Sequence, residues 1–177
     1  MAAPVNPNVR SCQKLTDPNE FVEALIGKPV SHVWRGYGSA ILLEFGELVP
    51  VRNGRGGERN PFGELCLMIE WSWRIENPRS ILGGSSSSEG KWQGMFKKIL
   101  GATATNVEFF GAVPEICVSF DNGRRVLSFS TVEGQPEWAI IARKPALGNL
   151  CVRGGRCYVE SAPNNGFNSD AGKARAG

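Results

Sequence analysis

The sequence predicts an α+β fold of two repeated units, each a short helix followed by three to four antiparallel strands, packed into one sandwich or barrel-like core. Three observations predict it. A helical pattern that ends in glycine occurs twice, an alternating triplet of large apolar residues follows each copy, and a Trp-x-hydrophobic segment closes each copy. One unit alone would leave an apolar strand face uncovered, so we expect the two units to share a core.

The composition shifts along the chain suggest five segments. The glycine and serine run in the middle is typical of a linker, and both ends are polar. The expected segments are a flexible N-terminal arm (1–16), repeat unit 1 (17–82), a Ser-rich linker (83–88), repeat unit 2 (89–142) and a basic, poorly ordered C-terminal tail (143–177).

The first helix is expected over 17–26. Asp17 suits the capping position, Pro18 suits the first helical position, and Gly27 suits the left-handed residue that ends a helix. The following residues alternate with period two, which predicts a half-buried strand around 41–45. The alternation over 65–76 predicts one long strand, or two joined by a bulge, with Trp71 on its apolar face.

The second half repeats the order. Ser86 and Glu89 are spaced as a capping box ahead of a helix that ends before Gly101. A strand follows around 116–120, and Asn122-Gly123 predicts a type I′ hairpin turn within 121–124. Leu127 and Phe129 then continue a return strand, and 138–141 forms the next one.

The two halves align motif by motif. Leu25-Ile26-Gly27 matches Ile99-Leu100-Gly101, the triplet at 41–45 matches the one at 116–120, and Trp73-Arg74-Ile75 matches Trp138-Ala139-Ile140. This pattern resembles an uncharacterised group of small bacterial proteins that carry a Leu-x-Gly, alternating-strand, Trp-x-hydrophobic unit once or twice. The resemblance covers about residues 17–142. It implies an accessory or immunity type of protein, without an established activity and without site residues.

Charge and cysteine usage exclude several classes. The net charge is +3, but residues 1–142 hold 14 basic and 15 acidic residues, so the expected folded body lacks the basic face of a nucleic-acid binder. The chain start lacks an apolar signal-like stretch, and a cytoplasmic location without a membrane segment is expected. Cys151 and Cys157 fit a small hairpin better than a zinc site; they are expected as free thiols, or as a disulfide under oxidising conditions.

The sequence holds no complete catalytic, cofactor or metal motif. His32 is the only histidine, and a structural or exposed role is favoured for it over a catalytic one. The segment Gly84–Trp92 departs from a phosphate-binding loop in its spacing, and Trp92 replaces the required hydroxyl residue. No cofactor is therefore expected, and no catalytic, cofactor-binding or metal-ligating residue is assigned.

Two function classes stay open. The first is a non-enzymatic protein-interaction module, an immunity or accessory protein for instance, whose partner is another protein. The second is a small-ligand binder or hydrolase with a pocket between the repeats, and its candidate acids are Glu44, Glu70 and Glu108. For the first class, the candidate surface combines an aromatic and arginine turn with a Gly/Arg loop, both poorly matched between the halves. It comprises Trp34, Arg35, Tyr37, Arg52, Arg55 and Arg59.

Overall fold

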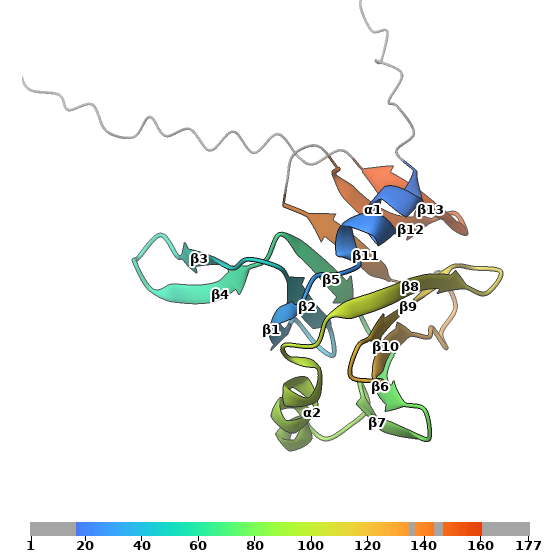
Figure 1. Ribbon diagram of the computed structural model, residues 1–177, viewed down its shortest axis with the longest axis horizontal. Coiled ribbons are helices and arrows are strands. Elements are labelled where there is room, and N and C mark those ends of the chain that lie inside the picture. The colour runs from blue at the N-terminus through green and yellow to red at the C-terminus, as the bar shows by residue number, and fades with distance from the viewer. Residues whose placement is uncertain (1–16, 135–136, 144–146, 161–177) are drawn as a thin grey trace, which may run out of the picture.

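The computed structural model describes residues 17–134, 137–143 and 147–160. These residues form two α-helices, one short 3₁₀ helix and thirteen β-strands, so the described fold is mostly β (Figure 1). All strand pairs are antiparallel, and they make three sheets of six, five and two strands.

The six-stranded sheet has the order β1-β2-β5-β11-β12-β13 and the five-stranded sheet the order β7-β6-β10-β9-β8. The first comprises β1 (Val30–Arg35), β2 (Ile41–Phe45), β5 (Leu65–Ile69), β11 (Trp138–Ala142), β12 (Asn149–Arg153) and β13 (Arg156–Glu160). The second comprises β6 (Trp73–Asn77), β7 (Ser80–Gly84), β8 (Ala104–Phe110), β9 (Glu115–Phe120) and β10 (Arg125–Ser128). A separate ribbon of β3 (Val49–Arg52) and β4 (Glu58–Phe62) projects from the body (Figure 1).

The predicted division into two units of one helix plus three to four strands is wrong. β5 and β6 are consecutive in the sequence, yet they lie in different sheets, and β10 and β11 separate in the same way. Strands from the two chain halves are therefore hydrogen-bonded to each other within both large sheets. Apart from Trp71, the pattern over 65–76 correctly marked the buried apolar residues, but a period of two does not identify the neighbouring strand.

The first helix, α1 (Pro18–Leu25), forms as predicted. The Asp17 carboxylate accepts a 3.0 Å hydrogen bond from the Asn19 backbone N–H, and Phe21 and Leu25 are buried. The second helix, α2 (Trp92–Ile99), follows the 3₁₀ helix η1 (Glu89–Lys91), and its N-cap residue is Lys91. The predicted capping box is therefore absent at the start of α2. The Ser87 carbonyl instead accepts a 2.9 Å hydrogen bond from the Trp92 indole N–H.

The hairpin predicted at 121–124 joins β9 and β10, but its turn is not type I′. Gly123 has φ 73°, whereas Trp71 is the non-glycine residue with positive φ in the described part of the chain. A type I′ turn requires positive φ at both central residues, so Asn122 does not meet it. The Asn122 side-chain amide donates to the Lys98 carbonyl at 3.1 Å and thereby ties the turn to the end of α2.

The expected linker and tail are both partly built into the sheets. Gly83 and Gly84 belong to β7, and the Gly84 N–H donates to the Ser87 hydroxyl at 3.0 Å. β12 and β13 fall within the segment expected to be a poorly ordered tail, and Leu150 of β12 is fully buried. The alternating apolar residues of this segment form strands despite its arginine and glycine content. The expected arm at 1–16 and the tail beyond 160 lie outside the described residues.

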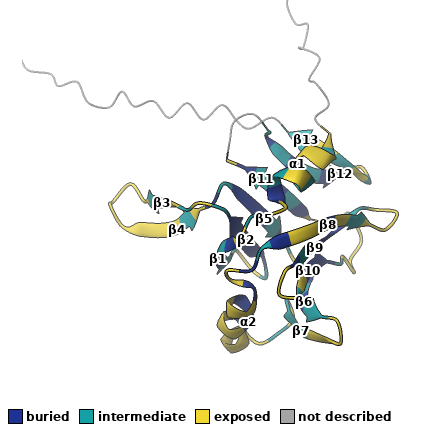
Figure 2. Ribbon diagram, in the orientation of Figure 1, coloured by how far each residue is buried: buried dark blue, intermediate teal, exposed yellow. Residues whose placement is uncertain are grey.

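One apolar cluster joins the inner faces of the two large sheets and both helices (Figure 2). Trp73 and Trp138 are its largest fully buried side chains. Trp73 meets Trp92 edge-to-face at 5.2 Å between ring centroids, and Trp138 stacks on Phe109 at 5.4 Å. Each α-helix has eight residues, and no described helix is long and apolar enough to cross a membrane.

Candidate functional site

The chain crosses from the six-stranded to the five-stranded sheet at Glu70-Trp71-Ser72. Trp71 there has φ 56° and a side chain that is 56% exposed. A left-handed conformation costs an L-residue roughly 1–2 kcal/mol, and such strain is concentrated at functional sites. Backbone bonds hold the crossing on both sides: Glu70 N–H donates to the Glu137 carbonyl at 2.8 Å, and Phe129 N–H donates to the Ser72 carbonyl at 3.1 Å. The sequence-based placement of Trp71 on a buried apolar face is therefore wrong.

A tight turn between β1 and β2 is attached to this crossing. The turn is closed by a 2.9 Å bond from the Gly36 N–H to the Ala40 carbonyl. The Ser39 hydroxyl donates to the Trp71 carbonyl at 2.9 Å, and the buried Trp73 indole donates to the Ser39 carbonyl at 2.6 Å. Tyr37, at the tip of the turn, is 96% exposed. Two exposed aromatic residues from distant parts of the sequence are thus held by neighbouring backbone.

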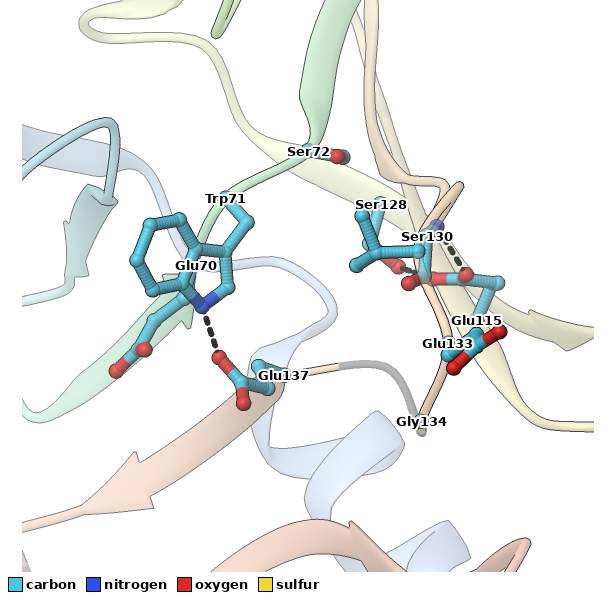
Figure 3. Close-up of a pocket in the computed structure, with 10 residues that line it drawn as sticks. Glu70, Trp71, Ser72, Glu115, Ser128, Ser130, Glu133, Gly134 and Glu137 are labelled. Carbon is cyan, nitrogen blue, oxygen red and sulfur yellow. Dashed lines mark hydrogen bonds between the residues drawn. The ribbon is translucent and has the colours of Figure 1, made fainter.

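An acidic cleft of about 480 Å³ opens beside the crossing (Figure 3). Its walls come from the crossing, the start of β9, the end of β10, the loop that follows, and the residue before β11. They carry four carboxyl groups and no basic side chain. The lining residues are Glu70, Trp71, Ser72, Glu115, Ser128, Ser130, Val132, Glu133, Gly134 and Glu137.

Hydrogen bonds orient two of these carboxylates. Glu137 accepts from the Trp71 indole N–H, as Figure 3 shows, so the indole is fixed against the cleft wall. Glu115 accepts from the Ser128 hydroxyl and from the Ser130 backbone N–H. Two of the four carboxylates of the cleft are therefore held in place by neighbouring groups.

The surroundings of Glu70 change the pKa of its carboxyl group. Partial burial, followed by the hydrogen bond and the charge of neighbouring Glu137, raises the pKa of the Glu70 carboxyl above its ordinary value. A cation placed near Glu70 would relieve this repulsion. The cleft therefore favours positively charged groups.

A second pocket of about 320 Å³ shares Glu70 and Trp71 with the cleft but has a different character. It lies at the ends of β1, β2 and β5, and three aromatic side chains line it. Its remaining surface is mostly apolar. The lining residues are Trp34, Gly36, Tyr37, Ala40, Leu42, Met68, Glu70 and Trp71, and we call it the aromatic pocket.

Behind the aromatic pocket, the carboxylate of Glu44 is completely buried on the outer side of β2. It accepts hydrogen bonds from the Trp34 indole at 3.2 Å and the Gly63 backbone N–H at 2.9 Å, and Arg143 lies 3.6 Å away. Burial, together with the nearby Glu44 charge, raises the pKa of the Cys66 thiol. The contacts of Glu44 therefore serve a structural role, and its hydrogen bond with Trp34 fixes the orientation of the Trp34 ring.

The structure separates the residues of the predicted interaction surface. Trp34 lies in β1 instead of a turn, and it shares the aromatic pocket with Tyr37. Arg35 is on the other side of the strand, where it pairs with Glu89 at 2.7 Å and lies 4.8 Å over the Trp92 ring. The three arginines of the Gly/Arg loop are exposed on the projecting ribbon, and one of them lines a small pocket with Trp34. These are Arg52, Arg55 and Arg59, of which Arg59 lines that pocket.

The three candidate acids also fail to converge. Glu44 is enclosed, and Glu108 is exposed on β8, where it accepts from the Asn106 amide at 2.9 Å. Glu70 alone among the three lines the cleft. His32 in β1 lies 3.2 Å from Asn60, on the outer side of the sheet. The three candidate acids and the histidine therefore do not form one site.

Cys151 and Cys157 are free thiols on neighbouring strands. Cys151 pairs in register with Tyr158 and Val152 pairs with Cys157, so the two thiols lie on opposite faces of the sheet. A disulfide between them would require backbone movement. In the described ranges, no three His, Cys, Asp or Glu side chains are grouped to hold a metal ion.

Sequence reasoning selected Trp34, Tyr37 and Glu70 but missed Ser39, Trp71 and Glu137 as site residues. The sequence did not reveal that Trp71 is exposed, because its neighbours continue an apolar alternation. Comparisons of this chain with protein-family models, with curated proteins and with solved structures return no match.

Proposed function

We propose that this chain is a non-enzymatic protein-interaction module, and that its acidic cleft receives a positively charged segment of a partner protein. The observation that carries the proposal is Trp71, a strained and exposed aromatic residue placed at the rim of a cleft lined by four carboxyl groups. Tryptophan is enriched at interaction hot spots, and acidic walls complement lysine and arginine. An immunity or accessory role is one version of this function, in which the partner would be a toxin or another bacterial protein.

The experiment places a photo-reactive amino acid at Val132, which is 69% exposed at the cleft, in the cells that make the protein. The captured partner is then purified, and its affinity is measured with charge-reversed variants. Glu133→Lys should weaken binding at least about tenfold, since it places a cation in the cleft. Glu23→Lys reverses an exposed charge on α1 and is the matched control, which should bind as the unchanged chain does.

Equal effects of Glu133→Lys and Glu23→Lys would show that only net charge matters and would refute a cleft-specific partner. Crosslinks from Tyr158 on β13 supply a further comparison, since Tyr158 is 40% exposed and does not line the cleft. A partner captured as well from Tyr158 as from Val132 would also contradict the proposal.

The exposed arginines of the β3–β4 ribbon form a second proposed contact area. Arg52 and Arg55 lie near its tip and are available to an acidic surface of the same partner. The Arg52→Glu and Arg55→Glu variants should each weaken binding less than Glu133→Lys does, because rim charges contribute less than charges in a cleft.

A further inference from the structure

We propose that the aromatic pocket binds an alkylated ammonium group, the head group that choline and trimethyllysine share. This goes beyond the proposed function, because it assigns a distinct pocket and a ligand chemistry that do not depend on the acidic cleft being a protein interface. Three features carry the inference: the aromatic walls, the charge at one end and the way in which the walls are held.

The walls suit a soft cation. Trp34, Tyr37 and Trp71 line the pocket, and the negatively polarised faces of aromatic rings attract quaternary ammonium groups. Leu42 and Met68 supply the apolar surface that methyl groups on nitrogen would contact. A bare ammonium needs hydrogen-bond acceptors for its N–H groups, and this lining is poor in them, so alkylation of the nitrogen improves the fit.

The charge at the pocket is of one sign. Glu70 is its only ionisable acid, and the eight lining residues include no lysine or arginine. Glu137 lies just beyond the Trp71 ring and adds a second negative charge. Both carboxylates would attract a cation, whereas they give no such attraction to a neutral apolar ligand of the same shape.

Two of the three aromatic walls, Trp34 and Trp71, are held by side-chain hydrogen bonds before a ligand arrives. The Trp34 indole is bonded to buried Glu44, and the Ser39 hydroxyl holds the Tyr37 turn against the Trp71 backbone. Gly36 lies close to two other lining residues, since a Cβ there would be 2.9 Å from the Leu42 Cδ1 and 3.0 Å from the Ala40 Cβ. Preorganised walls reduce the entropy lost on binding. A volume of about 320 Å³ lies at the small end of ligand pockets, which suits a head group.

The test is an NMR titration of the full chain with choline and with 3,3-dimethyl-1-butanol, its uncharged isostere in which carbon replaces nitrogen. Choline should shift the indole N–H signals of Trp34 and Trp71, and the isostere should bind at least about tenfold more weakly. Equal affinities would show an apolar pocket without cation selectivity and would overturn the proposal. The absence of any indole shift with both choline and a trimethyllysine peptide would overturn it as well.

Variants locate the binding site. Tyr37→Ala removes a side chain that is 96% exposed, so it tests the pocket without endangering the fold, and it should weaken choline binding severalfold. Glu70→Gln should weaken it too, whereas Glu133→Gln should not, because Glu133 lines only the acidic cleft. Choline binding that is insensitive to both Tyr37→Ala and Glu70→Gln would place the ligand elsewhere and refute the assignment.

A second arm distinguishes the source of the head group. Matched peptides that contain trimethyllysine or unmodified lysine are titrated in the same way. A peptide that binds more tightly than choline would identify a protein side chain as the source, and equal binding would identify a free small molecule. If choline does not bind the chain while a partner is still captured from Val132, this inference is refuted and the proposed function stands.

Discussion

The hydroxyl of Ser39 donates a 2.9 Å hydrogen bond to the carbonyl oxygen of Trp71, and this bond joins a turn of the six-stranded sheet to the point where the chain leaves that sheet. The turn carries Tyr37, and the crossing carries the Trp71 side chain. One side chain of modest size thus sets the spacing of two exposed aromatic residues.

Ser39→Ala removes the donor and leaves the Trp71 carbonyl to water. We expect a loss of about 1 kcal/mol in the free energy of unfolding, the typical contribution of one hydrogen bond. Choline affinity should also fall, because the turn that carries Tyr37 would no longer be bonded to the Trp71 carbonyl. Ser31→Ala is the matched control, since the Ser31 hydroxyl bonds the Gly46 carbonyl outside both pockets. Urea denaturation and the choline titration check both expectations, and an equal loss of choline affinity in the two variants would contradict the role of Ser39.

Trp71→Gly and Trp71→Ala remove the same indole but differ in backbone freedom. Because residue 71 has φ 56°, glycine adopts its conformation without the cost that alanine meets. We expect the glycine variant to exceed the alanine variant by about 1 kcal/mol in the free energy of unfolding. Both should lose choline binding. An alanine variant as stable as the glycine variant would show that the crossing relaxes to negative φ.

The raised pKa of Glu70 gives stability a pH dependence of definite sign. The folded protein binds the Glu70 proton more tightly than the unfolded chain does, so this contribution is complete below the unfolded pKa of about 4.3 and is lost as the pH rises through the folded pKa. Relative to the unchanged chain, Glu70→Gln should therefore gain stability as the pH rises above the unfolded pKa. Thermal denaturation at increasing pH measures the difference.

Choline affinity should change in the opposite direction, rising with pH as Glu70 ionises. Glu137, Glu115 and Glu133 face the same cleft and stay in place in the Glu70→Gln variant, so its pH profile controls for them. A choline affinity whose pH profile is the same in the Glu70→Gln variant would contradict the role assigned to Glu70.

Glu44→Gln keeps the shape of the side chain but removes its charge. Arg143 then loses its carboxylate partner, and the Trp34 and Gly63 donors meet a neutral acceptor. Hydrogen bonds to charged groups are worth about 1.5–3 kcal/mol, and we expect a loss of this order in the free energy of unfolding. Glu58→Gln, on exposed β4, is the control and should change stability little. A similarly small effect at Glu44 would show that its ion pair is dispensable.

Cysteine alkylation tests the burial pattern. Cys66 is fully buried, whereas Cys151 is half-buried on β12; burial raises the pKa of both thiols. Iodoacetamide reacts with thiolates, so Cys66 should be modified at least about tenfold more slowly than Cys151 in the folded protein. Mass spectrometry after timed quenching gives both rates, and the two should converge in denaturant. Rapid modification of Cys66 without denaturant would contradict its burial.

The sequence predicted what local chemistry determines. The Asp17 cap, α1 and the hairpin at 121–124 depend on neighbouring residues, and each is present in the structure. Strand partners depend on distant residues, so the pairing of β5 with β11 and of β10 with β6 was beyond a period-two pattern. The same limit explains why β12 and β13 were not predicted, since β12 pairs with β11.

The candidate site was predictable only in part. Trp34 and Tyr37 stood out because they lie close together near a turn, and both line the aromatic pocket. The crossing at Trp71 was hidden, because a positive φ at tryptophan has no composition signal and the flanking apolar alternation suggested a continuous strand. Glu137 joins the site through tertiary structure alone.

The chain passes between the two large sheets, so strands far apart in the sequence pair within each sheet. This arrangement affects how the protein folds during synthesis. β5 lies between β2 and β11 in the six-stranded sheet, and Leu67 pairs with Ile140. β5 therefore lacks one of its two neighbours until a segment much later in the sequence has been synthesised. Pairings of high sequence separation make folding slow. Until residue 142 has left the ribosome, one edge of β5 and its apolar neighbours stay available to wrong partners. Truncations that end before β11 should therefore aggregate.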